Sequence, residues 1–219
     1  MNPNPLLDRS LGELARSLPG ATGIFFAHEL DFCCGGKQLL RDALAARQLD
    51  PAPLLKALEG LIQHPLPAEH DWAQAPRTAL IEHILERYHA AHRQQLPELV
   101  RLSRRVESVH ADRPECPHGL ADHLEGMAHE LESHMQKEEQ ILFPLLAQGI
   151  PAAGLPPVNV MRHEHDQHGL ALERMVALAH QLDMPRGACN TWRALITGLR
   201  SLRADLMEHI HLENNLLFE

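Results

Sequence analysis

The chain has 219 residues, 44% of them hydrophobic and only 4% aromatic, and its net charge is −9 with histidine neutral. Such an acidic chain lacks the basic face that nucleic acids and anionic membranes require, which argues against both as partners. No apolar run approaches the roughly 20 residues of a transmembrane helix, and the start Met1-Asn-Pro-Asn-Pro5 lacks the basic segment and apolar core that are typical of a signal peptide. We therefore expect a cytoplasmic protein, whose four cysteines do not make a disulfide framework.

Short helical patterns fill the first part of the chain. Apolar residues at helical spacing predict three helices, at Leu6–Leu18, Thr22–Leu30 and Lys37–Arg47. Asp50 followed by Pro51 is typical of an N-cap and a first helical residue, and predicts a fourth helix that ends near His64. We expect residues 1–65 to form a small helical domain and the proline-containing stretch 66–76 to be a linker.

Four longer helical patterns, separated by short connections, fill residues 77–219. They cover Pro76–Val109, Gly119–Gln148, Pro156–Leu182 and Pro185–Phe218. Pro97 lies inside the first pattern and can kink or locally distort that helix. Because short connections make consecutive helices antiparallel, the sequence predicts an all-α protein. Its main part is an antiparallel four-helix bundle, preceded by the small helical domain.

A repeated motif is the most informative feature. The segment His134-Met-Gln-Lys-Glu-Glu-Gln-Ile-Leu-Phe143 returns 75 positions later (134 to 209) as His209-Ile-His-Leu-Glu-Asn-Asn-Leu-Leu-Phe218. Four residues are about one helical turn, so the His and Glu of each H-x-x-x-E share one helix face. That face is otherwise apolar, and a buried Glu is costly unless it is paired or binds a metal. Two metal chelates are favoured over the alternative of two exposed His–Glu pairs.

The first and third long patterns should complete such a site. The first offers His89 and His92, and the third offers His165 and His168. The distance along the chain does not choose between them, because His89 to His165 (165 − 89) and His92 to His168 (168 − 92) both span 76 residues. Two further histidines lie beside these faces, His83 and His163.

The donor set limits the metal. Imidazoles and carboxylates without thiolate suit iron, manganese or zinc, and two carboxylates that can bridge favour a pair of ions. A ferritin-like site needs two E-x-x-H motifs, and only Glu86-Arg-Tyr-His89 supplies one, so a histidine-rich, hemerythrin-like site fits better. Glu130 and Asp205 precede the repeated histidines by four residues. They are either acceptors for the second ring proton of those histidines or exposed helix acids.

Six segments together resemble a known family, the RIC (repair of iron centres) family of di-iron proteins, over nearly the whole chain. They are Asp31-Phe-Cys-Cys-Gly-Gly-Lys-Gln38, Arg87-Tyr-His89, His92-Arg-Gln-Gln-Leu-Pro-Glu-Leu99, His134-Met-Gln-Lys-Glu-Glu-Gln-Ile-Leu-Phe-Pro144, Glu164-His-Asp166 and His209-Ile-His-Leu-Glu-Asn-Asn215. The chain ends at Glu219, a few residues earlier than such proteins, which we expect to shorten the last helical turn without removing a ligand.

The resemblance implies two iron ions, oxo-bridged, in a hemerythrin-like bundle. Carried over position by position, the ligands would be His89, His134, Glu138, His165, His209 and Glu213. The two glutamates would bridge the ions, and it is the resemblance that selects His89 and His165. It also implies repair of iron–sulfur clusters damaged by nitric oxide or oxidants, by iron donation, with damaged iron–sulfur proteins as clients. A homodimer is compatible with this reading.

Two other functions use the same residues. Open iron positions could reduce nitric oxide or bind O2 or nitric oxide, or the bundle could hold zinc or manganese as a structural element. Cys33 and Cys34, before Gly35-Gly36, are adjacent thiols suited to soft metals, an iron–sulfur fragment or thiol exchange, and the alternative is two small buried side chains. We take Cys33 and Cys34 as a candidate thiol relay and assign Cys116 and Cys189 no role.

Overall fold

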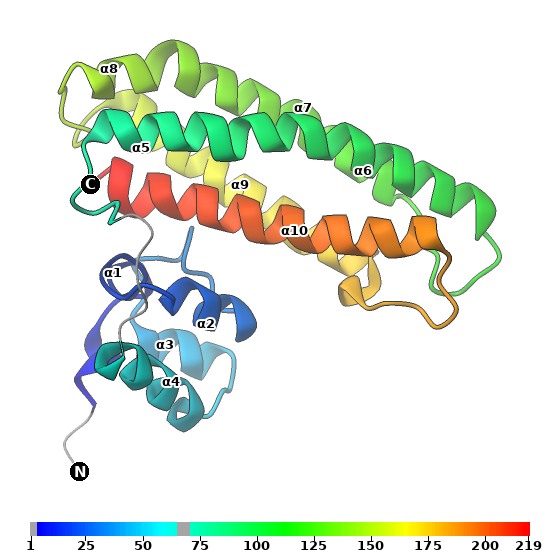
Figure 1. The fold of residues 1–219 in the computed structure, drawn as a ribbon, viewed down its shortest axis with the longest axis horizontal. Helices are drawn as coiled ribbons and strands as arrows, with labels where there is room; N and C mark the ends of the chain where they lie inside the picture. Colours follow the sequence, from blue (N-terminus) through cyan, green and yellow to red (C-terminus); the bar gives the residue numbers. More distant parts are fainter. Residues whose placement is uncertain (1–3, 65–70) are drawn as a thin grey trace. The chain divides into compact units, whose positions relative to one another are not determined.

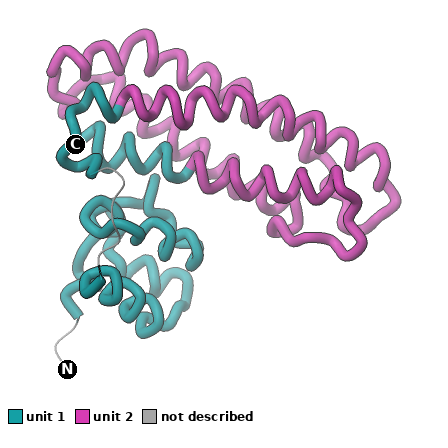
Figure 2. Tube along the Cα trace, viewed as in Figure 1, with its two compact units in different colours: residues 1–80, 207–219 teal, residues 81–206 magenta. Residues whose placement is uncertain are grey.

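The computed structural model describes residues 4–64 and 71–219, so residues 66–70 of the predicted linker lie outside the described residues. The chain divides into two compact units (Figure 2). We call residues 1–80 with 207–219 the N-terminal unit, and residues 81–206 the bundle unit. Among the described residues, no helix is both long and apolar enough to cross a lipid bilayer.

The bundle unit is made of four helical segments that run side by side in alternating directions (Figure 1). The first is α5 (Arg77–Ile84), which enters from the N-terminal unit, continued by η2 (Leu85–His89) and α6 (Ala90–Val109). The second is α7 (Leu120–Lys137), η3 (Glu138–Leu142) and α8 (Phe143–Ala147). The third is α9 (Pro156–Leu178) with the short η4 (His180–Leu182), and the fourth is α10 (Asn190–Leu212) as far as Leu206. The end of α10 and η5 (Glu213–Leu217) belong to the N-terminal unit. The predicted four-helix bundle is confirmed.

Leucine stripes hold this bundle together. Leu120, Leu124 and Leu131 of α7 are almost completely buried, as are Leu195 and Leu199 of α10. Each buried leucine contributes roughly 1.5–3 kcal/mol of hydrophobic stabilisation, which explains why the apolar period predicted these helices well. The helix α6 continues through Pro97 from Ala90 to Val109, so the proline does not end it.

The N-terminal unit carries the predicted small helices. They are α1 (Leu11–Ser17), α2 (Ala21–Ala27), α3 (Leu40–Ala46) and α4 (Pro51–Gln63). Their core includes Leu11, Leu14, Phe25, Leu40 and Leu54, all with no exposed surface. The unit also contains the start of α5 and the end of the chain from Met207.

Three predicted helices begin later than expected. The predicted helix Leu6–Leu18 is divided into the 3-10 turn η1 (Pro5–Asp8) and α1, because Ser10 is extended and its hydroxyl accepts the Glu13 N–H at 3.2 Å as an N-cap. Leu39 forms an isolated bridge with Ser10, so α3 starts only at Leu40. In the fourth long pattern α10 starts only at Asn190, because Gly187 before it has a φ of +75°, which a right-handed helix does not contain.

Candidate metal centre

Four of the predicted ligands lie in the bundle unit and meet around Glu138. His89 is at the end of η2, His134 is in α7, Glu138 starts η3 and His165 is in α9; none is more than 1% exposed. Glu138 Oε2 lies 3.4 Å from His89 Nε2, and its Oε1 lies 3.4 Å from His134 Nε2. The Nε2 atoms of His134 and His165 are 3.1 Å apart.

The remaining two predicted ligands lie one turn apart at the end of the fourth helix. His209, in the last turn of α10, and Glu213, the first residue of η5, have no exposed surface. His209 Nε2 and Glu213 Oε1 are 3.1 Å apart. The repeated H-x-x-x-E spacing therefore gives the same local His–Glu pairing in both copies.

The described residues include two groups of buried side chains that could hold a metal ion, and in each group the ligand atoms lie within 4.8 Å of one another. The first group is His89, Glu138, His209 and Glu213, and the second is His134, Glu138, His165 and Glu213. Glu138 and Glu213 belong to both. All six predicted ligands occur in these groups, and their role as ligands stays a prediction.

Two outer carboxylates fix which nitrogen of each imidazole is available. His89 Nδ1 donates to Glu139 Oε1 at 2.8 Å, and Arg93 Nη1 donates to the same oxygen at 2.8 Å. Burial by itself raises the pKa of Glu139, but the hydrogen bonds from Arg93 and His89 outweigh it and lower this pKa below its ordinary value. Because an ionised carboxylate only accepts, the proton of His89 is on Nδ1.

Glu164 has the same role for the second histidine. Its Oε2 accepts from His134 Nδ1 at 2.9 Å, and its other oxygen contacts Lys137. With their protons on Nδ1, His89 and His134 each direct an Nε2 lone pair at an oxygen of Glu138. Two electron-pair donors about 3.4 Å apart match two ligands of one ion, since metal–nitrogen and metal–oxygen bonds are roughly 2.0–2.2 Å long. The residues therefore fit a metal ion.

Three turns of π-helix coincide with these ligands. His89 is the last residue of η2, Glu138 the first of η3 and Glu213 the first of η5. A π turn inserts one residue into an α-helix and is frequent at functional sites, because the extra residue changes which side chains face inward. The sequence period predicted continuous helices here, and the structure differs by these three insertions.

The alternative histidines occupy other positions. His92 is buried beside Tyr88, with 6.4 Å between ring centroids, and His168 packs edge-on against His134 at 5.0 Å. Neither occurs in the two metal-binding groups of described residues. His83 packs against Tyr88 at 5.6 Å and His163 is exposed.

The predicted acceptors Glu130 and Asp205 are placed differently from each other. Glu130 is exposed, and the proton of His134 goes to Glu164 instead, so the first alternative is wrong for Glu130. Asp205 accepts from Arg87 at 2.6 Å and from Gln95 at 3.0 Å, which links α10 to the first segment of the bundle unit. Its sequence position alone did not predict either donor.

The paired cysteines lie in a tight loop of the N-terminal unit, organised by Asp31. Asp31 Oδ1 accepts the N–H groups of Cys33 at 3.2 Å and Cys34 at 2.9 Å, and Oδ2 accepts that of Gly35 at 2.9 Å. A Cβ on Gly35 would lie 2.7 Å from the Asp31 carbonyl oxygen, and one on Gly36 would lie 2.5 Å from a side-chain oxygen of the C-terminal segment. Because a side chain at either position would be too close to these oxygens, both positions require glycine.

Two asparagines that directly follow Glu213 hold this loop. Asn214 Nδ2 donates to the Cys33 carbonyl at 3.1 Å, and Asn215 Nδ2 donates to the Phe32 carbonyl at 3.0 Å. Phe32 and Cys33 are 2% and 4% exposed, so these bonds satisfy buried carbonyl groups. Sequence reasoning assigned the asparagines no role, since nothing local indicates a partner about 180 residues away.

Comparisons with known proteins agree with this geometry. A family described as "Hemerythrin HHE cation binding domain" matches residues 80–219, and a "Domain of Unknown function (DUF542)" matches residues 7–62. The chain belongs to the hemerythrin HHE family. Proteins named "Iron-sulfur cluster repair protein YtfE" from Pectobacterium carotovorum and Musicola paradisiaca are 50% identical to it over 96% of this chain and 95% of theirs. The protein of that name from Yersinia pseudotuberculosis is 51% identical over the same shares.

For this hemerythrin HHE protein, the family match spans every predicted metal ligand, and the other match spans the loop with Cys33 and Cys34. The identity with the cluster repair proteins extends over both regions, so the chain belongs to that group within the family. The resemblance found in the sequence is confirmed. The roles of Glu139 and Glu164 were not predicted from the sequence. There, each is simply an acidic residue next to a histidine motif.

Proposed function

We propose that this protein is a di-iron protein that repairs iron–sulfur clusters damaged by nitrosative or oxidative stress, by donating iron to damaged iron–sulfur proteins in the cytoplasm. The observation that carries the proposal is the pair of buried groups that share Glu138 and Glu213. Two carboxylates this deeply buried repel each other and are costly without nearby positive charge, which a pair of iron ions supplies. The 50% identity to cluster repair proteins supports the same function.

In the proposed site the irons have only nitrogen and oxygen ligands. His89, His134, His165 and His209 would hold the ions, together with the two glutamates that both groups share. Iron bound there would supply chemistry between the ferrous and ferric states and, if oxo-bridged, a visible absorption. Glu139 and Glu164 hold the protons of His89 and His134 on Nδ1, which keeps Nε2 available for the metal.

The proposed division of labour places metal binding in residues 77–219 and thiol chemistry in residues 1–65, joined by the linker 66–76. Cys33 and Cys34 are not among the six proposed iron ligands. They act as a relay to the client, either for iron or for electrons. The hydrogen bond with Cys34 and burial raise the pKa of the Cys33 thiol well above its ordinary value. Cys33 is buried and Cys34 is only partly buried, so Cys34 is the more accessible thiol of the pair.

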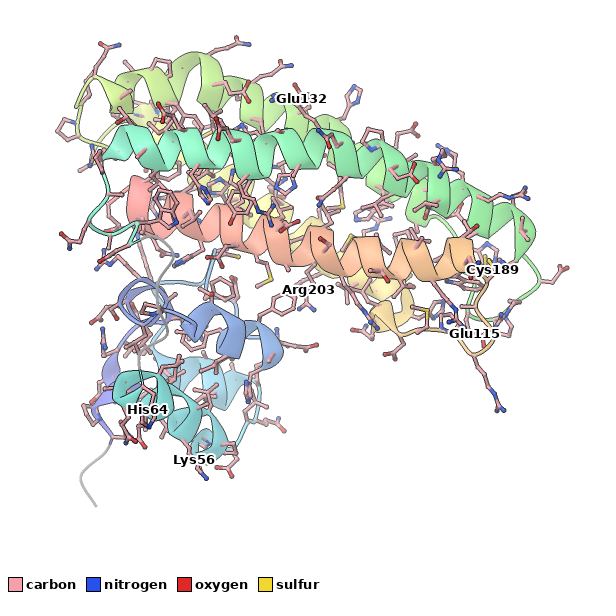
Figure 3. All side chains as sticks on the ribbon, in the orientation of Figure 1. Lys56, His64, Glu115, Glu132, Cys189 and Arg203 are labelled. Carbon is pink, nitrogen blue, oxygen red and sulfur yellow. The ribbon has the colours of Figure 1, made fainter. Side chains whose placement is uncertain are left out.

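The test is anaerobic repair of a dehydratase whose cluster was damaged with nitric oxide. We expect reactivation by the iron-loaded protein, accompanied by stoichiometric loss of iron from it. The Cys33→Ser/Cys34→Ser variant should keep its iron and visible spectrum but lose most repair activity. A matched control is Cys189→Ser. Cys189 is exposed beside the start of α10 (Figure 3), and its Sγ lies 3.3 Å from His110 Nε2.

Three other outcomes of these measurements would favour a different function, a different metal or a different set of ligands. Catalytic consumption of nitric oxide with a reductant, without iron loss, would favour the nitric oxide-reducing or gas-binding alternative. Zinc or manganese in the purified protein, with no visible band, would indicate a structural metal. Loss of iron in the double cysteine variant would mean that the six-ligand set is incomplete.

A further inference from the structure

A second cluster of metal-ligating side chains lies in the loop of the N-terminal unit, and it goes beyond the proposed function because none of the six iron ligands belongs to it. Its members are Asp31, Cys33 and Cys34, whose ligand atoms lie within 4.8 Å of one another. We propose that these three residues form a separate site for one thiophilic divalent cation, such as Zn²⁺, bound by two thiolates and one carboxylate.

The spacing of the donor atoms suits one tetrahedral ion. Two sulfurs that each lie about 2.3 Å from such an ion are roughly 3.8 Å apart. The Sγ atoms of Cys33 and Cys34 are separated by 3.8 Å. A sulfur and a carboxylate oxygen on the same ion lie roughly 3.2–3.6 Å apart, and Cys33 Sγ lies 3.2 Å from Asp31 Oδ1.

The loop is held in this arrangement before any ion binds. The Asp31 carboxylate accepts three consecutive backbone N–H groups, and Asn214 and Asn215 fix the carbonyls of Cys33 and Phe32. The Cys33 thiol donates to Asp31 Oδ1, so a cation can take the place of that proton. A ligand set with little freedom to lose on binding gives higher affinity.

The charge of the site also favours a cation. Asp31, Cys33 and Cys34 would place three negative charges together once the thiols ionise, and only a cation makes this favourable. Binding forms two metal–sulfur bonds and one metal–oxygen bond, releases the two thiol protons to the buffer and changes no oxidation state. Because Cys34 is half-exposed and three protein ligands leave a fourth position open, the ion can enter and leave.

The experiment titrates Cd²⁺ into the reduced full-length protein carrying Cys116→Ser and Cys189→Ser, so that Cys33 and Cys34 are the remaining thiols. The sulfur-to-metal charge-transfer band in the ultraviolet reports thiolate ligation only, so the histidine–glutamate site does not interfere. We expect the band to saturate at one thiolate-bound ion per chain, both with and without iron in the bundle. Competition with Zn²⁺ should abolish it.

Variants test each ligand. Adding Cys34→Ser should weaken binding at least tenfold. Adding Asp31→Asn, which keeps an oxygen to accept the Cys33 and Cys34 N–H groups but loses the acceptor of the Gly35 N–H, should also weaken it at least tenfold while keeping the band. The exposed Asp42→Asn is the matched control and should change nothing. Circular dichroism and iron content check folding. Absence of the band, half an ion per chain, or unchanged affinity in folded Asp31→Asn would overturn the three-ligand site.

Discussion

Each copy of the repeated motif contains one predicted His ligand and one predicted Glu ligand, but the two residues that follow the glutamate differ between the copies. In the first copy these residues are Glu139 and Gln140, and in the second they are Asn214 and Asn215. Glu139 accepts the ring proton of His89, whereas Asn214 donates to the carbonyl of Cys33. The repeated positions therefore supply the metal site, and the non-repeated ones tie each copy to a different neighbour.

This difference teaches how one helical motif acquires two uses. The first copy orients a histidine inside the bundle unit, and the second copy holds the cysteine loop of the N-terminal unit. The two metal-binding groups themselves are alike in one respect, because the first contains a histidine held by Glu139 and the second a histidine held by Glu164. Variants at these positions should separate the two roles.

The largest effect is expected from the shared glutamates. Replacing Glu138 or Glu213 by Leu should remove most of the bound iron, because each carboxylate belongs to both groups. Replacing His92 or His168 by Leu is the matched control, since both are buried but occur in neither group. Iron content per folded chain, by elemental analysis, measures the effect. Equal iron in all four variants would refute the bridging assignment.

A smaller effect is expected from the carboxylates that orient the imidazoles. Glu139→Gln or Glu164→Gln should weaken metal affinity by about 10–100-fold, because a neutral amide no longer fixes the ring proton on Nδ1. The exposed Glu173→Gln on α9 is the control. Competition with a chelator of known affinity gives the change, and wild-type affinity in both variants would show that these bonds do not tune the site.

The smallest effect is expected where the second copy holds the loop. Asn214→Ala or Asn215→Ala leaves a buried carbonyl without its donor and should lower the free energy of unfolding by about 1–3 kcal/mol. Gln140→Ala is the matched control, because Gln140 is the exposed counterpart of Asn215 in the first copy. Urea unfolding of iron-loaded protein gives the difference, and an equal change in Gln140→Ala would remove the distinction between the copies.

The sequence predicted the parts of the molecule that depend on local period. The bundle helices follow from leucine stripes such as Leu195 to Leu206, which are buried as expected. The His–Glu pairs follow from the four-residue spacing of His134 with Glu138 and of His209 with Glu213. The choice of His89 over His92 did not follow from spacing and needed the resemblance to a family.

Features that depend on distant contacts were missed. The hydrogen bond from Asn214 to Cys33 joins residues 181 positions apart, and the one from His89 to Glu139 joins residues 50 apart. The break at Ser10 was missed because leucines continue at helical spacing on both sides of it, although the serine caps α1. The apolar period indicates which face of a helix is buried, but it does not indicate which polar groups form hydrogen bonds with one another.

The π turn η3 also bears on how sequences of this kind should be aligned. It adds one residue between His134, the predicted ligand of α7, and the buried ring of Phe143, which is 3% exposed. Because a π turn holds one residue more than an α turn over about the same rotation, deleting Gln140 would return this turn to α geometry and leave the later residues, Phe143 included, close to their present orientation. The change would fall on the residues of the turn itself, which begins at the predicted ligand Glu138. At this place in the chain the number of residues matters more than their identity, so a relative with a one-residue gap here should be read as having lost the turn itself.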